Sequence, residues 1–359
     1  MQANEKVSIL FNFSSSYVGG GFKRLKAYLN WYNENHLQYK SIFIINKRIA
    51  YLELQFPNVT IYTVNPSKFA RFFCDDYYLN RILKNHNAID VYFAYGFPVY
   101  RRLAKLNWFH LSNLLPLKTE LTCKTSFERL KMKLLAHRIK RSLPKIDIFS
   151  AESPSSIKIS IDSWADTTIP EKYCLENGID EYLMESDTDP CLKAQYAISI
   201  GTKYYKRIDK VIEIFKVLNS SYSELEFKII GPSLGQNKFN RYGLDIEFID
   251  NLPQLAVYSI LRQTKFFVSA SSVENSPNSL LEAILLAEKC IISDIPAHRD
   301  LLKRLGVDKI NKLKIGNEFF LEIQKVNVSL LKNSLSWDHI IKKKMNYISS
   351  ILKTSSNHV

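Results

Sequence analysis

The sequence lacks the features of fibrous, linker-dominated and membrane-spanning chains. Only 11 of its 359 residues are glycine and 12 are proline, which excludes a collagen-like repeat and a chain made mainly of linkers. No apolar run approaches the roughly 18 to 20 residues that a transmembrane helix needs. The N-terminal stretch MQANEKVSILFNF begins polar and contains polar breaks, so we expect a first β-strand there and no secretory signal.

Cysteine is also scarce, and its spacing argues against two common kinds of site. No two cysteines form a C-x-x-C pair, and their number is odd. A disulfide framework or a zinc site would need closely spaced pairs. The pattern predicts reduced thiols and a cytoplasmic protein. The five positions are Cys74, Cys123, Cys174, Cys191 and Cys290.

Acidic residues are depleted in the first half of the chain. Residues 1–150 contain 23 Lys and Arg but only 9 Asp and Glu, whereas residues 151–359 contain 26 of each kind. The whole net charge of +14 therefore lies in the first half. One basic half joined to one neutral half favours a domain that faces a polyanion, such as anionic lipid or a phosphorylated substrate. Nucleic acid is not expected as a partner, because no recognition motif accompanies the charge.

What is present is enough apolar material for two packed cores, since hydrophobic residues make up 46% of the chain. Short apolar strands alternate with amphipathic helices in both halves, which is typical of parallel sheets covered on both faces. We therefore predict an α/β protein with two doubly wound, Rossmann-like domains. The predicted strands are Val7–Phe13, Ser41–Ile45, Val59–Val64, Asp90–Tyr95, Asn107–Leu111, Asp147–Ala151, Tyr196–Ile200, Glu226–Ile230, Ile246–Ile249, Phe266–Ala270 and Cys290–Ser293. The predicted helices are Phe22–Glu34, Ile208–Leu218, Leu255–Gln263, Asn278–Ala287, Ala297–Leu305 and Ser336–Leu352.

Two loops fit the rule that ligands of open parallel sheets bind at strand carboxyl ends, beside helix N-termini that attract anions. The first is Ser14–Gly21, in which three glycines precede a helix and Lys23 and Arg24 add positive charge. It is not a dinucleotide fingerprint, because Arg24 stands in place of the third glycine. Either these glycines let a ligand approach the backbone, or they serve only the turn.

The second loop is Ser271–Glu282. Ser276 is a good helix N-cap and Pro277 a good first helical residue, so the helix is expected to start there. The backbone amides of Asn278 and Ser279 would then point beyond the preceding strand, at a place where a diphosphate fits.

Glu274 and Glu282 lie eight positions apart, on this loop and in the helix that follows it. Two carboxylates so placed can contact opposite ends of one elongated ligand. Acidic residues near a helix start are also favourable without any ligand, because they interact with the helix dipole.

This E-x7-E pattern, with its strand, loop and helix, resembles the signature of the GT4-type retaining glycosyltransferases, which have the GT-B fold. FFVSAS and VENSPNSLLEAILLAEKCIISDIPAHRDLL are similar to that family almost continuously. IGTKYYKRIDKVIEIFKVL, FKIIGP, the linker ENGID and the terminal SWDHIIKKKMNYI also resemble it, in the expected order. The similarity is strong from about residue 196 to 305 and moderate over most of the remaining chain.

The resemblance implies two Rossmann-like domains that face each other across a cleft. Residues 1–178 would form the acceptor-side domain and residues 179–335 the donor-binding domain, and the helix in residues 336–359 would cross back to the first domain. The implied activity is sugar transfer, with retention, from a nucleotide-diphosphate-sugar to a hydroxyl of a lipid-linked or growing glycan. The implied setting is cytoplasmic assembly of a surface polysaccharide such as O-antigen or capsule. Together with the positive charge of residues 1–150, it predicts peripheral contact of these residues with an anionic membrane at the inner face of the plasma membrane.

The resemblance also assigns roles to individual residues. Glu282 would bind the ribose hydroxyls of the donor, and Glu274 would lie beside the transferred sugar. Lys206, with Arg207 beside it, would neutralise the leaving diphosphate, and His110 in WFHLSN would face the reacting sugar. The remaining substrate-binding candidates are Gly19, Gly20, Gly21, Asn278 and Ser279.

One position departs from the family pattern, because Thr202 follows Gly201 where the family usually has Arg. This departure supports an alternative, a GT-B subunit that binds nucleotide-sugars without turnover; a sugar-nucleotide epimerase is a weaker alternative. Asp187 and Asp189 imitate a D-x-D metal motif, but they lie in an acidic linker rather than after a buried strand. No metal or other cofactor is therefore expected.

The segment Ser126–Leu143 predicts a basic amphipathic helix. Met132, Leu135, Ile139 and Leu143 share one face, and lysines and arginines surround them. This face either lies on an anionic membrane surface or packs on the first sheet.

Overall fold

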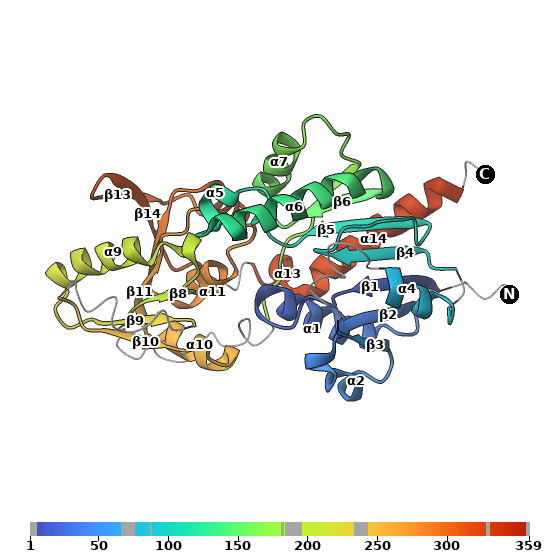
Figure 1. Ribbon diagram of the computed structural model, residues 1–359. Coiled ribbons are helices and arrows are strands. Elements are labelled where there is room, and N and C mark those ends of the chain that lie inside the picture. Colours follow the sequence, from blue (N-terminus) through green and yellow to red (C-terminus); the bar gives the residue numbers. More distant parts are fainter. Residues whose placement is uncertain are drawn as a thin grey trace. The chain divides into compact units, whose positions relative to one another are not determined.

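The computed structural model describes residues 6–65, 76–86, 88–180, 183, 196–232, 243–327 and 331–356. The chain forms two compact units, each built on a seven-stranded sheet (Figure 1). Residues 1–117, 130–180 and 334–359 make up the first unit, and residues 118–129 and 181–333 the second. Residues 118–129, which the sequence places in the first domain, thus cluster with the second unit.

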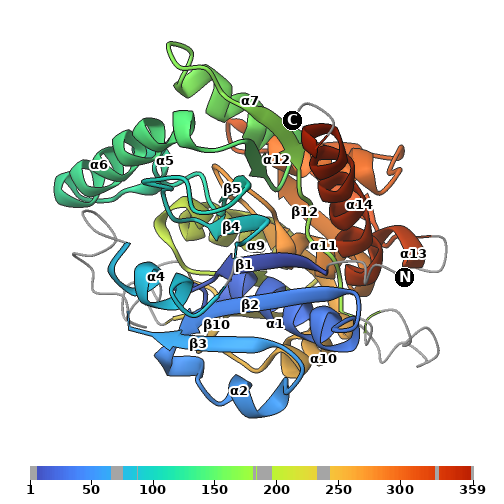
Figure 2. The same ribbon diagram turned by 90° about the vertical axis from the view of Figure 1, so that its right-hand side faces the viewer.

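The first sheet is wholly parallel, in the order β3-β2-β1-β4-β5-β6-β7 (Figure 2). Its strands are β1 (Val7–Asn12), β2 (Tyr39–Asn46), β3 (Thr60–Val64), β4 (Val91–Tyr95), β5 (Leu106–Leu111), β6 (Ile148–Ala151) and β7 (Glu171–Cys174). The associated helices are α1 (Gly19–Glu34), α2 (Leu52–Gln55), α4 (Asp76–Leu83), α6 (Ser126–Ser142), α7 (Pro154–Ser163) and α14 (Trp337–Ser356), with the short turns η1 (Lys47–Ile49) and η2 (Leu143–Lys145). Helix α6 begins among the residues of the second unit.

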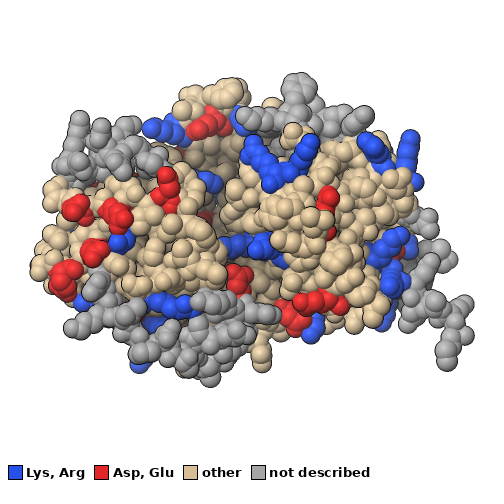
Figure 3. Space-filling view, turned by 90° about the horizontal axis from the view of Figure 1, so that it is seen from below, with Lys and Arg blue, Asp and Glu red and all other residues tan. Residues whose placement is uncertain are grey.

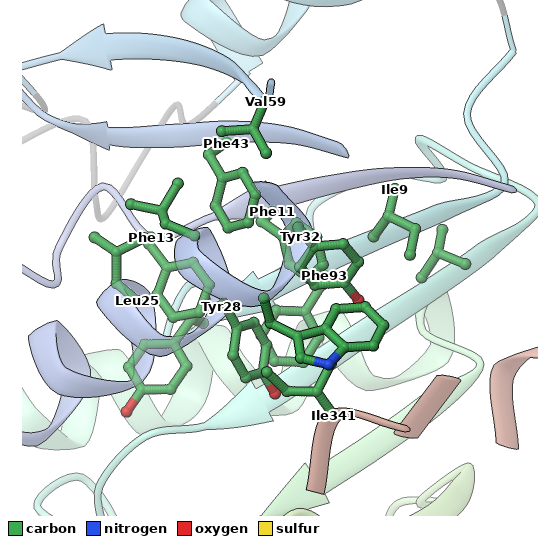
Figure 4. Packing of buried hydrophobic residues seen from close by; sticks show 14 of the residues in the cluster. Ile9, Phe11, Phe13, Leu25, Tyr28, Tyr32, Phe43, Val59, Phe93 and Ile341 are labelled. Carbon is green, nitrogen blue, oxygen red and sulfur yellow. The ribbon is translucent and has the colours of Figure 1, made fainter. Parts of the chain in front are cut away.

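An aromatic core joins this sheet to α1 and α14 (Figure 4). Phe11 of β1 stacks on Phe43 of β2 with ring centroids 4.6 Å apart, and Tyr32 of α1 lies 4.9 Å from Phe11. Helix α14 adds Ile341 and Met345, both of which are buried in the same cluster. Their spacing puts these apolar residues on one helical face, and burying that face holds α14 on the first unit. The predicted return of the C-terminal helix is confirmed.

The second sheet has the order β10-β9-β8-β11-β12-β14-β13, with β14 and β13 antiparallel to their neighbours. Helix α9 buries Val211, Ile212 and Phe215 against the strands. The strands are β8 (Tyr196–Ile200), β9 (Glu226–Ile230), β10 (Ile246–Ile249), β11 (Thr264–Ser269), β12 (Lys289–Ser293), β13 (Asn311–Ile315) and β14 (Glu318–Gln324). The helices are α5 (Thr119–Thr122), α9 (Ile208–Ser221), α10 (Gln254–Arg262), α11 (Asn278–Leu286) and α12 (Pro296–Arg304), with the turn η3 (Tyr204–Lys206); α13 (Lys332–Leu335) precedes α14.

The predicted fold class is confirmed, since both units are doubly wound α/β units. The sequence did not predict β7, α7, or the β13–β14 hairpin. Strand β13 reads NKLKI and is mostly exposed, so it lacks the continuous apolar run that marked the central strands. It forms the edge of its sheet, where only one neighbour supplies hydrogen bonds.

Lysine and arginine side chains are frequent on the face of the first unit that Figure 3 draws. Within the described part of the chain, no helix is long and apolar enough to cross a membrane.

Candidate active site

The loop after β8 places Lys206 over the strand end. Gly201 has a φ of +96°, a conformation that favours glycine, and a Cβ atom there would lie 3.1 Å from Cε of Lys206. The Gly201 amide donates to the Ile230 carbonyl at 2.7 Å, so the chain leaves β8 alongside β9. The positive φ of Gly201 disfavours any side chain at this position, and Lys206 approaches its backbone closely.

Lys206 forms an ion pair with Glu274, which follows β11. Its Nζ lies 2.6 Å from Glu274 Oε1, and Ser271 Oγ donates to the same oxygen at 2.8 Å. The two charged side chains are only 16% and 10% exposed. The structure therefore brings these two predicted site residues together, at the carboxyl ends of two neighbouring parallel strands.

Backbone contacts hold the two loops against each other. The Ser272 amide donates to the Tyr205 carbonyl at 2.8 Å, and Ser293 Oγ of β12 donates to the Ser271 carbonyl at 2.6 Å. Burial, together with the Glu274 charge, raises the pKa of Tyr205, so its hydroxyl stays protonated. The loops that carry Lys206 and Glu274 thus form one connected structure.

His298 lies behind this site and was not predicted from the sequence. It is fully buried in α12, and its Nδ1 lies 2.7 Å from the Ser293 carbonyl oxygen. Burial lowers the pKa of His298 to about 4, while the charges of Glu274 and Lys206 act on it in opposite directions. His298 is therefore neutral at pH 7 and donates from Nδ1. Nothing in the surrounding sequence PAHRDLL indicates that this histidine is buried next to the site.

Glu282 lies in α11 and is almost completely buried, with 7% exposure. Gln254, the first residue of α10, donates from Nε2 to Glu282 Oε2 at 3.1 Å. Gln254 was also missed, because its contact with α11 depends on how two helices pack.

The start of α11 differs from the prediction. The helix begins at Asn278, and Pro277 instead of Ser276 occupies the N-cap position. The Asn278 amide is not directed outward, because it donates to the Ser276 carbonyl at 2.9 Å. The first backbone hydrogen bond of the helix is donated by the Leu281 amide to the Pro277 carbonyl. The amides of Ser279 and Leu280 therefore have no acceptor within the helix.

Arg207 does not join Lys206 in this site. It has a left-handed φ of 53°, and its guanidinium pairs with Glu318 at the start of β14. This pairing holds the pKa of Glu318 below its usual range.

His110, in the first unit, is fully buried in β5. Its Nδ1 lies 2.9 Å from Ser150 Oγ and its Nε2 lies 3.6 Å from Glu152 Oε1. Tyr95 stacks on the imidazole with ring centroids 5.1 Å apart. Burial lowers the pKa of His110 to about 4, so the ring is neutral at pH 7.

The glycine loop is mostly helix. Gly19, Gly20 and Gly21 are the first three residues of α1, whereas the sequence predicts a start at Phe22. A Cβ atom at Gly21 would lie 3.0 Å from both Ser16 Oγ and a Tyr95 ring carbon. Close packing therefore requires Gly21.

The predicted contribution of Arg24 to an anion site is wrong, because its guanidinium is completely buried. It donates to the Asn177 side chain at 2.6 Å, to the Leu175 carbonyl at 3.0 Å and to the Glu176 carbonyl at 3.2 Å. It also lies 3.4 Å from Glu152. Arg24 thus anchors the ENGID segment to the first unit.

Residues 192–309 match the family model described as glycosyl transferases group 1. The matched segment runs through β8 to α12 and contains Lys206, Glu274 and Glu282. No curated protein matches the chain in sequence.

Solved structures with a similar fold extend the comparison to both units. Anabaena HepE in complex with UDP has a TM-score of 0.60 and 11% sequence identity, over 96% of this chain and 100% of that chain. The E. coli trehalose-6-phosphate protein bound with UDP-2-fluoro glucose has a TM-score of 0.54 and 10% identity, over 83% of this chain and 86% of that chain. The two units therefore have the GT-B fold.

Thr202, the departure from the predicted pattern, has a structural role in the second unit. Its side chain is buried, and Oγ1 donates to the Pro232 carbonyl at 2.8 Å. It links the loop after β8 to the loop after β9.

Two further predictions concern metal and thiol chemistry. Asp187 and Asp189 lie outside the described residues. No group of three or more His, Cys, Asp or Glu side chains that could hold a metal ion occurs in the described ranges. Cys123, Cys174 and Cys290 are free thiols.

Proposed function

We propose that this protein is a retaining glycosyltransferase that moves a sugar from a nucleotide-diphosphate-sugar to a hydroxyl of a lipid-linked or growing glycan. The observation that carries the proposal is the Lys206–Glu274 pair, 2.6 Å apart at the ends of β8 and β11. It lies within the residues that match the group 1 model. Anionic ligands of open parallel sheets bind at this edge.

The donor site follows from these contacts. Negative charge develops on the diphosphate as the sugar leaves, and Lys206 is assigned to stabilise it. The Ser279 amide, at the start of α11, is assigned to the same phosphates. Glu282 is assigned to the ribose hydroxyls, with Gln254 orienting its carboxylate. Glu274 is assigned to the transferred sugar.

Two predicted donor contacts are revised in this scheme. The Asn278 amide already donates to the Ser276 carbonyl, so the predicted contact of this amide with the donor phosphates is not retained. Arg207 pairs with Glu318, so charge neutralisation is assigned to Lys206 alone.

Retention is supported by resemblance to the GT4-type family and by a solved structure of similar fold. The trehalose-6-phosphate synthase studied for glycosyl transfer with retention has a TM-score of 0.55 and 10% identity to this chain. We assign His110 and the α1 glycines, Gly19–Gly21, to the acceptor side. His110 must become accessible to touch a substrate, because Tyr95 covers its ring in this structure.

The biological setting proposed is the cytoplasmic assembly of a surface polysaccharide, at the inner face of an anionic membrane. The basic first half of the chain supports this setting, since a polyprenyl-phosphate-linked acceptor would lie at such a surface. We also propose that turnover needs no metal ion.

A second candidate is a subunit that binds a nucleotide-sugar without turnover. Thr202 favours it, because a buried threonine replaces the arginine that the family uses beside the donor phosphate.

A thermal-shift screen of UDP-, GDP-, dTDP- and ADP-sugars tests the proposal, since a ligand that binds only the folded state raises the melting temperature. The screen is run with and without excess chelator, and each binder is then assayed for slow donor hydrolysis. Binding with hydrolysis supports the enzyme, and binding without any hydrolysis or transfer supports the second candidate. No shift with any donor overturns both.

A further inference from the structure

Helix α6 carries apolar side chains on two opposite faces. One face is the predicted one, and the structure shows that it packs inward: Ile139 and Leu143 are buried, and Met132 and Leu135 are half-buried. The other face carries Phe127, Leu130 and Leu134, which are 77%, 68% and 40% exposed. We call these three residues the α6 outer row.

The α6 outer row stands out within the described part of the chain. No other helix there has more than one large apolar side chain of comparable exposure. Spacings of three and four residues put the row on a single stripe of the helix. Exposing such a stripe to water is unfavourable, which indicates that something covers it.

The N-terminus of α6 is capped by side chains of the chain itself, so it needs no partner molecule to form. Thr125 Oγ1 accepts from the Glu128 amide at 3.2 Å, and Glu128 Oε2 accepts from the Thr125 and Lys124 amides at 3.3 and 3.1 Å. This reciprocal capping box holds Phe127 in helical geometry. The outer row is therefore preformed on the helix labelled α6 in Figure 2.

The charges of α6 identify the occupant. The helix has six lysines and arginines and one acid, Glu128, whose carboxylate serves the capping box. Lys140 pairs with Asp166, whereas no described residue forms an ion pair with the basic residues nearest the outer row: Arg129, Lys131 and Lys133. A second copy of the chain would bring like charges together. An anionic lipid surface neutralises them while covering the apolar stripe.

We propose that the α6 outer row inserts into the headgroup region of an anionic bilayer, with Arg129, Lys131 and Lys133 on the lipid phosphates. This inference rests on the proposed function, because the membrane contact would hold the enzyme beside a lipid-linked acceptor. The face that contacts the membrane is then the outer row and not the predicted face with Ile139 and Leu143. The membrane contact is limited to this one helix of the basic half.

Vesicle co-sedimentation tests the proposal with the full-length protein. We expect binding to vesicles of 30% phosphatidylglycerol that falls as salt rises from 0.1 to 1 M, because the Debye length shrinks from about 10 to about 3 Å. The triple variant Phe127→Ser, Leu130→Ser, Leu134→Ser is expected to bind roughly tenfold more weakly or worse, because each apolar side chain adds to interfacial binding. Reversal of two charges, Lys131→Glu with Lys133→Glu, should have a similar effect.

Leu54→Ser is the matched control, because Leu54 is 90% exposed in the same basic half but lies on α2. It should bind vesicles within twofold of the wild type. Failure of the wild type to bind, or equal binding by the triple variant, would overturn the proposal. So would a wild-type dimer that dissociates in the triple variant, since a second copy would then cover the row.

Nucleotide-sugar binding by all variants is measured separately by thermal shift. If it persists while vesicle binding is lost, the membrane contact and the donor site are independent. If no donor binds to any protein, the proposed function fails, whereas the vesicle result still decides the role of α6.

Discussion

The ammonium nitrogen of Lys206 lies 2.6 Å from a carboxylate oxygen of Glu274, although 68 residues separate them. Each residue comes from a loop that follows a parallel strand. A hydrogen bond from the Ser272 amide to the Tyr205 carbonyl links the two loops. The two charges satisfy each other. A bound diphosphate would share Lys206, and the transferred sugar would lie beside Glu274.

Replacing Lys206 by alanine should weaken nucleotide-sugar binding. The loss of a charged hydrogen bond costs roughly 1.5–3 kcal/mol, or about 10- to 150-fold in affinity. Calorimetric titration with the donor found in the thermal-shift screen measures it. Arg207→Ala is the control and should bind almost normally, because Arg207 pairs with Glu318. The reverse order of effects would move the phosphate contact to Arg207.

Glu282 should be tested by Glu282→Gln, which preserves its shape and removes its charge. Donor affinity should fall by roughly 1.5–3 kcal/mol if the carboxylate binds ribose hydroxyls. Gln254→Leu should have a smaller effect in the same direction, since it only frees the Glu282 carboxylate. Glu224→Gln, at an exposed site, serves as the control. Unchanged affinity of Glu282→Gln would exclude the ribose assignment.

The buried histidines predict a loss of stability in mild acid. His110 and His298 have pKa values of about 4, against an ordinary value of 6.5. Between these pH values the unfolded chain binds more protons than the folded protein, so stability is full above about pH 6.5 and falls as the pH drops towards 4. At pH 5 the loss is roughly 2 kcal/mol for each histidine.

Urea unfolding at pH 7.5 and pH 5 measures this loss. His298→Gln removes one of the two titrations and should reduce the difference between the two pH values by about 2 kcal/mol, whatever its stability at pH 7.5. His339→Gln should leave the difference unchanged, because His339 is exposed. An unaltered difference in His298→Gln would mean that the pKa of His298 is the same in the folded protein as in the unfolded chain.

Lys344 should lower the stability of the first unit at neutral pH. It is fully buried on α14, and its Nζ lies 4.2 Å from the Tyr28 ring centroid and 4.6 Å from that of Phe11. Burial holds the pKa of Lys344 well below its usual range, although contact with the rings favours the charged form. The free energy of unfolding should therefore rise as the pH increases towards 10.5, where the unfolded amine also loses its proton.

Lys344→Met removes this penalty and should stabilise the protein at pH 7 by about 1–3 kcal/mol, with a smaller gain at pH 10. Thermal unfolding at both pH values measures it, with the exposed Lys343→Met as the control on the same helix. A destabilised Lys344→Met at pH 7 would show that the contacts of the lysine with the aromatic rings outweigh the cost of burying it.

Local sequence patterns were enough to predict much of the fold. Val91–Tyr95 and Phe266–Val268 are continuous apolar runs, which are typical of strands buried on both faces. In α14, the spacing of Ile341, Met345 and Ile348 was enough to predict an amphipathic helix with a buried face. Such patterns depend on one element at a time, so the sequence alone reveals them.

Side-chain partners were predicted less well, because they depend on contacts between distant segments. From the sequence, Arg24 is expected to be a surface cation beside a glycine loop. In the structure it is buried, and it donates to the carbonyl groups of residues 175 and 176 and to the Asn177 side chain. Arg207 adjoins Lys206 in sequence, yet Glu318 on an unpredicted hairpin pairs with it. Ser276 has the better cap chemistry, but the chain path puts Pro277 at that position.

The sequence by itself determined the two α/β units, the E-x7-E segment and the basic first half, since periodicity, spacing and composition are properties of a linear chain. Only the tertiary structure decided that Lys206 meets Glu274, that His110 is enclosed by Tyr95, Ser150 and Glu152, and that α6 exposes Phe127, Leu130 and Leu134. The physical reason is that burial and pairing depend on which distant residues the packed core brings within a few ångströms of each other. An isolated helix or loop contains no information about the surface that will cover it.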